Sequence, residues 1–100
     1  MIASFRQLQI FAAVARHLSY TRAAEELNLT QPAVFTQVRQ IQDQVGTPLI
    51  ERIGKRLYLT EAGRVVLATA REILGEMERL DMRLAELNGM VRGRLRVAVV

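Results

Sequence analysis

YTRAAEELNLTQPAVFTQVRQIQDQV, residues 20–45, is the stretch that decides the fold of this chain. Its pattern predicts two helices joined by a tight turn at 28–30. Asn28 tolerates the positive φ that such a turn requires, and Thr30 can cap the second helix. Pro32 fits a first helical turn, where its missing N–H costs nothing. The stretch is therefore typical of a helix-turn-helix, whose second helix enters the major groove of DNA. The two helices are expected at 20–27 and 31–45.

The second helix has an apolar stripe and a polar face. The stripe recurs at steps of four and three residues, as a buried helix face does; its members are Val34, Val38, Ile41 and Val45. The opposite face suits base reading, because Gln can match adenine, Arg can pair with guanine and apolar groups can touch the thymine methyl. The expected contacts to DNA from this helix are Thr30, Gln31, Pro32, Phe35, Thr36 and Arg39. An ordinary amphipathic surface helix would show a similar pattern.

Phe35 leaves two interpretations open. It stands on the flank of the exposed face, one residue from the buried Val34. It could press on a thymine methyl, or it could turn inward and extend the core.

Residues 3–18 predict a further helix that completes a three-helix core. One apolar face is expected to pack on the helix-turn-helix; its members are Phe5, Leu8, Phe11, Ala12, Ala15 and Leu18. His17, at the end of this helix, is the only histidine. With no cysteine and no second histidine, we expect no catalytic or metal role for it.

Two short strands, 49–53 and 57–59, are predicted after the long helix. The turn between them is expected at 54–56 and carries Lys55 and Arg56, with Arg52 near the base of the hairpin. A small hairpin after a helix-turn-helix is a wing, and basic side chains on a wing can lie along phosphates or enter a narrow minor groove. A cationic turn that is merely solvated is the alternative.

A long helix is predicted at 61–91, with Thr60 as its N-cap. Apolar residues follow it at steps of four and three, which is a heptad seam; they are Val66, Ala70, Ile73, Met77, Leu80, Leu84, Leu87 and Val91. A domain this small cannot bury such a long seam, so we expect a second copy of the helix in a homodimer. Packing against a domain that this chain lacks is the alternative.

The last residues predict the start of another domain. Asn88 and Gly89 can end the long helix, and the apolar run at 94–100 is typical of a strand. We therefore divide the chain into a DNA-binding domain at 1–60, a linker helix at 61–91, and at 92–100 the beginning of a domain that continues beyond the sequence given.

Composition narrows the classes of function. Half of the 100 residues are apolar, cysteine is absent and the net charge is +4, with the basic surplus in residues 1–60 and 92–100. A basic surface favours a polyanionic partner. No apolar run approaches a membrane span. No phosphate loop or nucleophile paired with a base is present, so we expect no enzyme and no cofactor or metal site, and we expect a cytoplasmic protein.

The chain resembles the N-terminal DNA-binding domain of LysR-type transcriptional regulators, a bacterial family. The resemblance rests on RQLQIFAAVARHLSYTRAAEELNLTQPAVFTQVRQIQDQVGTPLIER, on LTEAG at 59–63, on the long helix and on GRLRVAVV at the end. It implies a mainly α fold: a winged helix-turn-helix followed by a dimerising linker helix, with an effector-binding domain beyond it. Family members bind interrupted inverted repeats in double-stranded DNA, usually as tetramers, and sense a small molecule through that further domain.

Three positions depart from the family pattern. Phe35 stands where Ser is usual, Gln42 where Glu is common and Ile50 where Phe is frequent. Within the family, the chain looks most similar to regulators of carbon-fixation operons. The competing function is a winged-helix protein-interaction module with a coiled-coil helix, which would not need both a basic wing and a polar recognition face.

Overall fold

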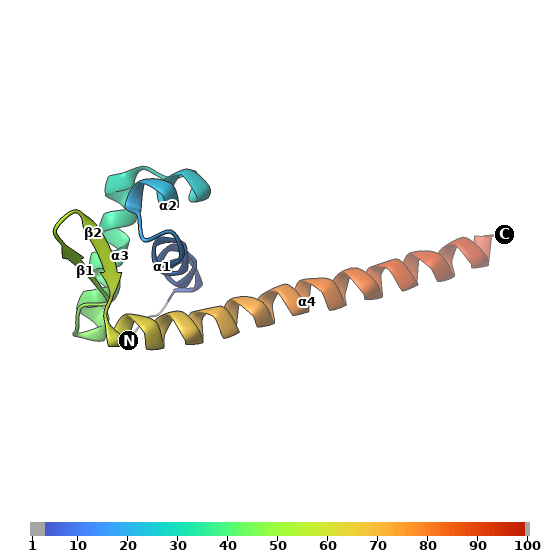
Figure 1. The fold of residues 1–100 in the computed structure, drawn as a ribbon. Coiled ribbons are helices and arrows are strands. Elements are labelled where there is room, and N and C mark those ends of the chain that lie inside the picture. The colour runs from blue at the N-terminus through green and yellow to red at the C-terminus, as the bar shows by residue number, and fades with distance from the viewer. Residues whose placement is uncertain (1–3, 100) are drawn as a thin grey trace.

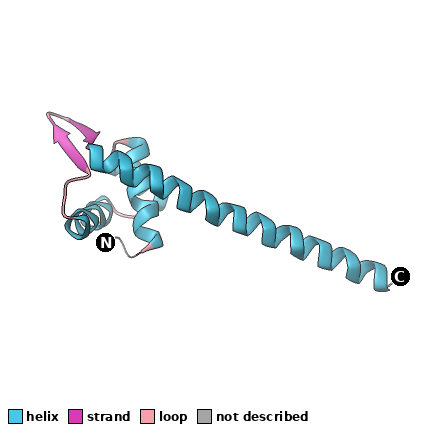
Figure 2. Cartoon of the chain, turned by 90° about the horizontal axis from the view of Figure 1, so that it is seen from below, coloured by secondary structure: helices cyan, strands magenta, loops and turns pink. Residues whose placement is uncertain are grey.

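The computed structural model describes residues 4–99, and their side chains as far as Gly89. Four helices and one hairpin follow one another along the chain (Figure 1). They are α1 (Phe5–His17), α2 (Tyr20–Leu27), α3 (Gln31–Val45), β1 (Ile50–Ile53), β2 (Arg56–Leu59) and α4 (Glu61–Val99). The first five elements and the start of α4 form a head, residues 4–74, from which the rest of α4 projects (Figures 1 and 2). The molecule therefore measures 67 Å in one direction but only 24 and 18 Å in the others.

Side-chain caps define where the helices begin, as the sequence predicted for α3 and α4. The oxygen of Thr30 accepts a hydrogen bond from the backbone N–H of Ala33 at 3.3 Å, and that of Thr60 from Gly63 at 3.0 Å. Each bond satisfies a helical N–H that has no partner within its own helix. Ser4 and Ser19 cap α1 and α2 in the same way. Residues in the left-handed conformation end the first three helices; they are Leu18, Asn28 and Gly46.

Helix α1 is the centre of the head, and the apolar face predicted for it was only partly right: Phe11, Ala12 and Ala15 are buried as predicted. Phe5 and Leu18, two members of that face, are exposed. Burial instead covers consecutive residues, because α1 packs against α2, α3 and α4 on different sides. The buried residues are Gln7, Ile10, Phe11, Ala12, Ala13, Val14 and Ala15. A single apolar stripe is expected when a helix packs on one neighbour. It does not describe α1, because α1 packs on three other helices.

The hairpin forms as predicted except at its turn. Ile50 pairs with Leu59 and Ile53 with Arg56 in an antiparallel register. Arg56 therefore belongs to β2, and the turn is shorter than the predicted 54–56: it consists of Gly54 and Lys55. Gly54 has a φ of 63°, which a glycine adopts without strain.

The base of the hairpin is attached to α3 and to the start of α4. The side-chain oxygen of Gln42 accepts hydrogen bonds from the backbone N–H groups of Leu49 (3.0 Å) and Ile50 (3.2 Å). The carbonyl of Leu49 accepts from the N–H of Thr60 at 3.0 Å. A Cβ on Gly63 would lie only 2.0 Å from that carbonyl oxygen, so α4 can approach this close only with glycine there. These contacts hold the hairpin in one orientation relative to α3.

Helix α4 does not end where the sequence predicted. It continues through Asn88 and Gly89 to Val99, so the strand expected at 94–100 is helical over 94–99, and Val100 lies outside the described residues. A glycine inside a helix costs only about 1 kcal/mol and does not stop it. A strand also needs a neighbour for its backbone hydrogen bonds, and the only sheet in the described part of the chain is β1–β2. The division into 1–60, 61–91 and 92–100 stays a prediction.

The predicted seam of α4 divides into two parts. Val66 packs against the core and Ala70 is fully buried, so these two residues belong to the head. Five further members are between 40 and 56% exposed and form what we call the apolar stripe: Ile73, Met77, Leu80, Leu84 and Leu87. The side chain of Val91 lies outside the described ones.

Candidate nucleic-acid interface

Helix α3 presents a polar face to solvent, as its sequence predicted. Val34, Val38 and Ile41 are at most 1% exposed and fix the opposite side of the helix in the core. The predicted reading residues are all exposed; they are Gln31, Pro32, Phe35, Thr36 and Arg39. Whether they contact DNA stays a prediction, but their placement on one accessible face is what base reading requires.

Two polar groups are oriented at the start of α3. The hydroxyl of Thr21, in α2, donates to the side-chain oxygen of Gln31 at 3.4 Å, which orients the amide of Gln31. Thr30 accepts the capping bond of α3 through its hydroxyl oxygen, so its hydroxyl hydrogen can still be donated to a phosphate.

Phe35 points away from the core. Its side chain is 44% exposed, and its ring meets that of Tyr20 edge-on, with the ring centroids 5.3 Å apart and the planes at 68°. The interpretation in which Phe35 turns inward and extends the core was therefore wrong. Its ring is accessible to a ligand and is in contact with another aromatic ring.

The wing carries three exposed cations: Arg52 in β1, Lys55 in the turn and Arg56 in β2. Arg52 is close enough to Tyr20, at the start of α2, for its charge to act on the phenol. Burial raises the pKa of the Tyr20 hydroxyl, and the positive charge of Arg52 opposes that rise. The base of the wing therefore lies near the same tyrosine that touches Phe35.

A groove of about 660 Å³ runs between the start of α1 and the exposed side of α3. Pro32 and Thr36 line it from α3, and Arg6 lines it from α1. Arg6 is exposed and its guanidinium donates to Gln9 at 3.3 Å. Sequence reasoning treated α1 only as a core helix and missed this cation. The available signal was its place in the first turn of α1, two residues after the cap at Ser4.

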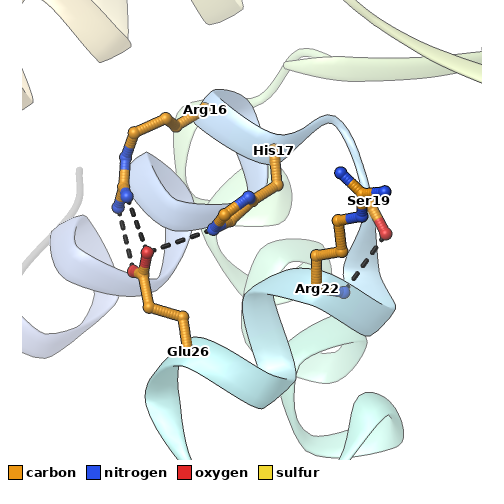
Figure 3. A network of polar contacts seen from close by, with 5 residues as sticks. All are labelled: Arg16, His17, Ser19, Arg22 and Glu26. Carbon is orange, nitrogen blue, oxygen red and sulfur yellow. Dashed lines mark hydrogen bonds and ion pairs between the residues drawn. The ribbon is translucent and has the colours of Figure 1, made fainter.

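An ion-pair cluster joins α1 to α2 (Figure 3). The guanidinium of Arg16 donates two hydrogen bonds to the carboxylate of Glu26, at 2.6 and 2.9 Å, and Nε2 of His17 lies 3.1 Å from the same carboxylate. These bonds lower the pKa of Glu26 to about 2, and the bond to Glu26 raises that of Arg16. His17 is thus part of a contact between helices. Among the described side chains, those of residues 4–89, no group of three or more acidic or histidine residues is placed to hold a metal ion.

The three-helix head, the hairpin and the exposed α3 face define a winged helix-turn-helix, followed here by a long helix. Residues 5–64 match the family described as "Bacterial regulatory helix-turn-helix protein, lysR family". The chain belongs to this LysR family of DNA-binding transcriptional regulators, as the sequence resemblance predicted.

Individual relatives agree with this assignment. The chain is 54% identical, over 99 residues, to a RuBisCO operon transcriptional regulator of Allochromatium vinosum, covering 99% of this chain and 33% of the relative. It is 49% identical over 98 residues to a protein of the same name from Acidithiobacillus ferrooxidans, covering 98% of this chain and 32% of the relative. The crystal structure of a complex between the DNA-binding domain of CbnR and DNA superposes with a TM-score of 0.74 at 36% identity, covering 81% of this chain and 93% of that one.

The chain spans about a third of the length of these curated relatives. Within the described residues, no helix combines the length and the apolar character needed to cross a membrane.

Proposed function

We propose that this chain is the DNA-reading part of a sequence-specific regulator, in which α3 enters the major groove and the wing lies on the backbone or in the minor groove. The observation that carries the proposal is the junction at Tyr20. There the ring of Phe35, on the exposed face of α3, contacts Tyr20, and the charge of Arg52 at the base of the wing acts on the phenol of the same tyrosine. A base-reading face beside a basic hairpin is the arrangement that duplex DNA requires.

Each predicted contact has its own chemistry. Gln31, with an oriented amide, can match the two polar edges of adenine, and Arg39 can pair with guanine. Lys55 and Arg56 would neutralise phosphates, as would Arg6 at the other end of the α3 face. Phosphate contacts set position and affinity, whereas base contacts set sequence preference. Specificity is therefore assigned to α3 and salt sensitivity to the wing.

The apolar stripe of α4 supports a dimer. Its five side chains extend over about 21 Å of helix at 1.5 Å per residue, and each of them is at least 40% exposed. A groove of about 470 Å³ lies where the stripe begins, lined by Leu8, Val65 and Ile73 among others. A second copy of α4 would cover the stripe symmetrically, and a two-fold dimer would read an inverted repeat.

The further parts of the proposal rest on family membership. The relatives are about three times as long as this chain. We propose that the intact protein works in the cytoplasm as a tetramer on interrupted inverted repeats, and that it binds a small-molecule effector through a further domain. The names of its relatives suggest the promoter of a carbon-fixation operon as its target.

Salt-dependent DNA affinity distinguishes this function from a protein-interaction module. The chain should bind duplex DNA with an affinity that falls steeply as salt rises, because bound phosphates release counterions. Replacing both Lys55 and Arg56 by Ala should weaken binding to all sequences and reduce the slope of log K against log salt by roughly one to two units per wing.

The control removes two charges elsewhere. Arg71→Ala with Arg83→Ala takes two exposed cations from α4 and should leave the slope unchanged, with light scattering confirming the same assembly. If the slope decreased equally in both double variants, or did not decrease in the wing variant, the wing would not be part of the DNA interface.

Light scattering tests the dimer. Replacing Leu80 and Leu84 by Glu should yield a monomer, because charges cannot be buried in an apolar seam without partners. Met82 is exposed on the opposite side of the helix, since residues two apart differ by about 200°. Met82→Glu should therefore remain a dimer.

A further inference from the structure

Tyr20 makes contacts in two directions: with the core and with the exposed Phe35. It is the first residue of α2, directly after the capping Ser19. Its side chain is half-buried and packs against the core, which limits the directions its ring can take. The rest of the ring extends to the exposed side and meets Phe35.

Phe35 needs such a neighbour if it is to read a base. An exposed aromatic side chain on a helix exchanges between rotamers, and only some of them present the ring to a groove. The edge-on contact, with centroids 5.3 Å apart, is in the range in which aromatic pairs attract each other. Because Tyr20 is anchored in the core, the contact restricts Phe35 and not the reverse.

The charge of Arg52, in β1 of the wing, acts on the phenol of Tyr20, and burial keeps its pKa above the ordinary value. The group is therefore neutral at physiological pH. Tyr20 therefore touches one residue that is predicted to contact a base, and its phenol experiences the charge of another that is predicted to contact the backbone.

We propose that Tyr20 is a positioning residue for sequence readout: its ring holds Phe35 outward, so that Phe35 presents an apolar edge to the 5-methyl group of a thymine. This inference rests on the proposed DNA-binding function. Tyr20 itself need not touch DNA. The pair would account for a recognition helix that works with Phe at a position where the family usually has Ser.

The ordinary alternative is that Tyr20 only stabilises the start of α2. In that case its removal would lower the melting temperature and weaken binding to every sequence alike. If it positions Phe35, its removal would instead erase one particular preference, and would do so only while Phe35 is present.

The experiment measures dependence on a single methyl group. A binding site is selected from random duplexes with the unaltered chain, and each thymine in it is then replaced by deoxyuridine, which lacks only the 5-methyl. At one or two positions this replacement should weaken binding by about 2- to 10-fold, the range of a modest apolar contact. Tyr20→Leu and Phe35→Leu should each lose most of that sensitivity at the same positions, whereas Tyr20→Phe, which keeps the ring, should retain it.

Combining the changes tests positioning directly. In the Phe35→Leu background, Tyr20→Leu should cause no further loss of sensitivity, since Tyr20 acts through Phe35. All measurements are made below the melting temperature of each variant. If Tyr20→Leu is poorly folded, Tyr20→Met provides a second ring-free variant with similar apolar bulk.

The possible failures are distinguishable. If the unaltered chain selects no site, the proposed function fails. If it selects a site but shows no methyl sensitivity, or if Tyr20→Leu keeps that sensitivity while Phe35→Leu loses it, the positioning role is overturned and DNA binding stands.

Discussion

In the head, Phe11, Ile41 and Leu49 are fully buried, whereas Leu80, Leu84 and Leu87 on the distal part of α4 are about half exposed. Ile41 belongs to the apolar stripe of α3, just as the three leucines belong to the apolar stripe of α4. The difference is that three neighbouring helices surround α1, while α4 projects beyond the head at these three leucines, with no other described element packed along it. Apolar periodicity thus shows which side of a helix avoids water. It does not show whether the covering surface belongs to the same chain.

Truncating an apolar side chain to Ala should change the free energy of unfolding far more in the head than in the distal part of α4. Phe11→Ala removes a fully buried ring and should lower the free energy of unfolding by about 3–5 kcal/mol. Leu84→Ala, measured at concentrations low enough to give monomers, should change it by less than about 0.5 kcal/mol. Urea denaturation of both variants provides the comparison, and a similar loss for each would mean that the distal α4 folds back on the head.

Gln42→Ala should destabilise the head, but by less than Phe11→Ala does. It leaves the N–H groups of Leu49 and Ile50 without their acceptor, at a cost of about 1–3 kcal/mol. Gln42→Glu is the matched control, because it keeps an acceptor oxygen and should lose less. Chemical denaturation measures both, and equal losses would indicate that the two hydrogen bonds contribute little.

Replacing glycine by alanine should have opposite effects on stability at two positions of α4. A Cβ on Gly63 would collide with the carbonyl of Leu49, so Gly63→Ala should destabilise the head by about 1–3 kcal/mol. Gly89 has nothing within 4 Å of an added Cβ, so Gly89→Ala should stabilise α4 by about 1 kcal/mol. Thermal melts and helical circular dichroism report the two effects. A stabilising Gly63→Ala would contradict the close approach of α4 to the hairpin.

The smallest effect concerns the exposed cluster around Glu26. Arg16 and His17 lower the pKa of this carboxyl from 4.5 to about 2 in the folded chain. Its contribution to stability should therefore be complete above pH 4.5 and disappear as the pH falls from 4.5 to 2. Unfolding curves over this range should show a weaker pH dependence in Glu26→Gln than in the unaltered chain. Identical pH profiles would mean that the ion pairs do not persist in solution.

The helix-turn-helix was predictable because its signals are local. The backbone conformation at each helix end depends on a single nearby residue: Asn28, Thr30 or Pro32. The structure confirms the helix boundaries that these residues define. The exposed face of α3 followed from the same stretch. The hairpin and the start of α4 at Thr60 were also local features.

The parts that sequence could not supply depend on contacts between distant residues. Arg6 reaches the groove beside α3 only through the packing of α1, and Glu26 reaches His17 only through the turn between helices. The ring contact between Tyr20 and Phe35 joins two helices in the same way. The end of α4 was missed for a different reason: glycine weakens a helix but does not stop it, so Gly89 was a poor boundary.

The central claim is that the head reads DNA and the apolar stripe pairs two heads, and one affinity ratio tests both parts. The Kd values for an inverted repeat and for a single half-site are measured with the unaltered chain and with the variant carrying Glu at Leu80 and Leu84. The unaltered chain should prefer the repeat by about 10²- to 10⁴-fold, whereas the variant should bind the half-site equally well and lose that preference. A folded variant that keeps the preference, or that loses binding to the half-site, would contradict the account.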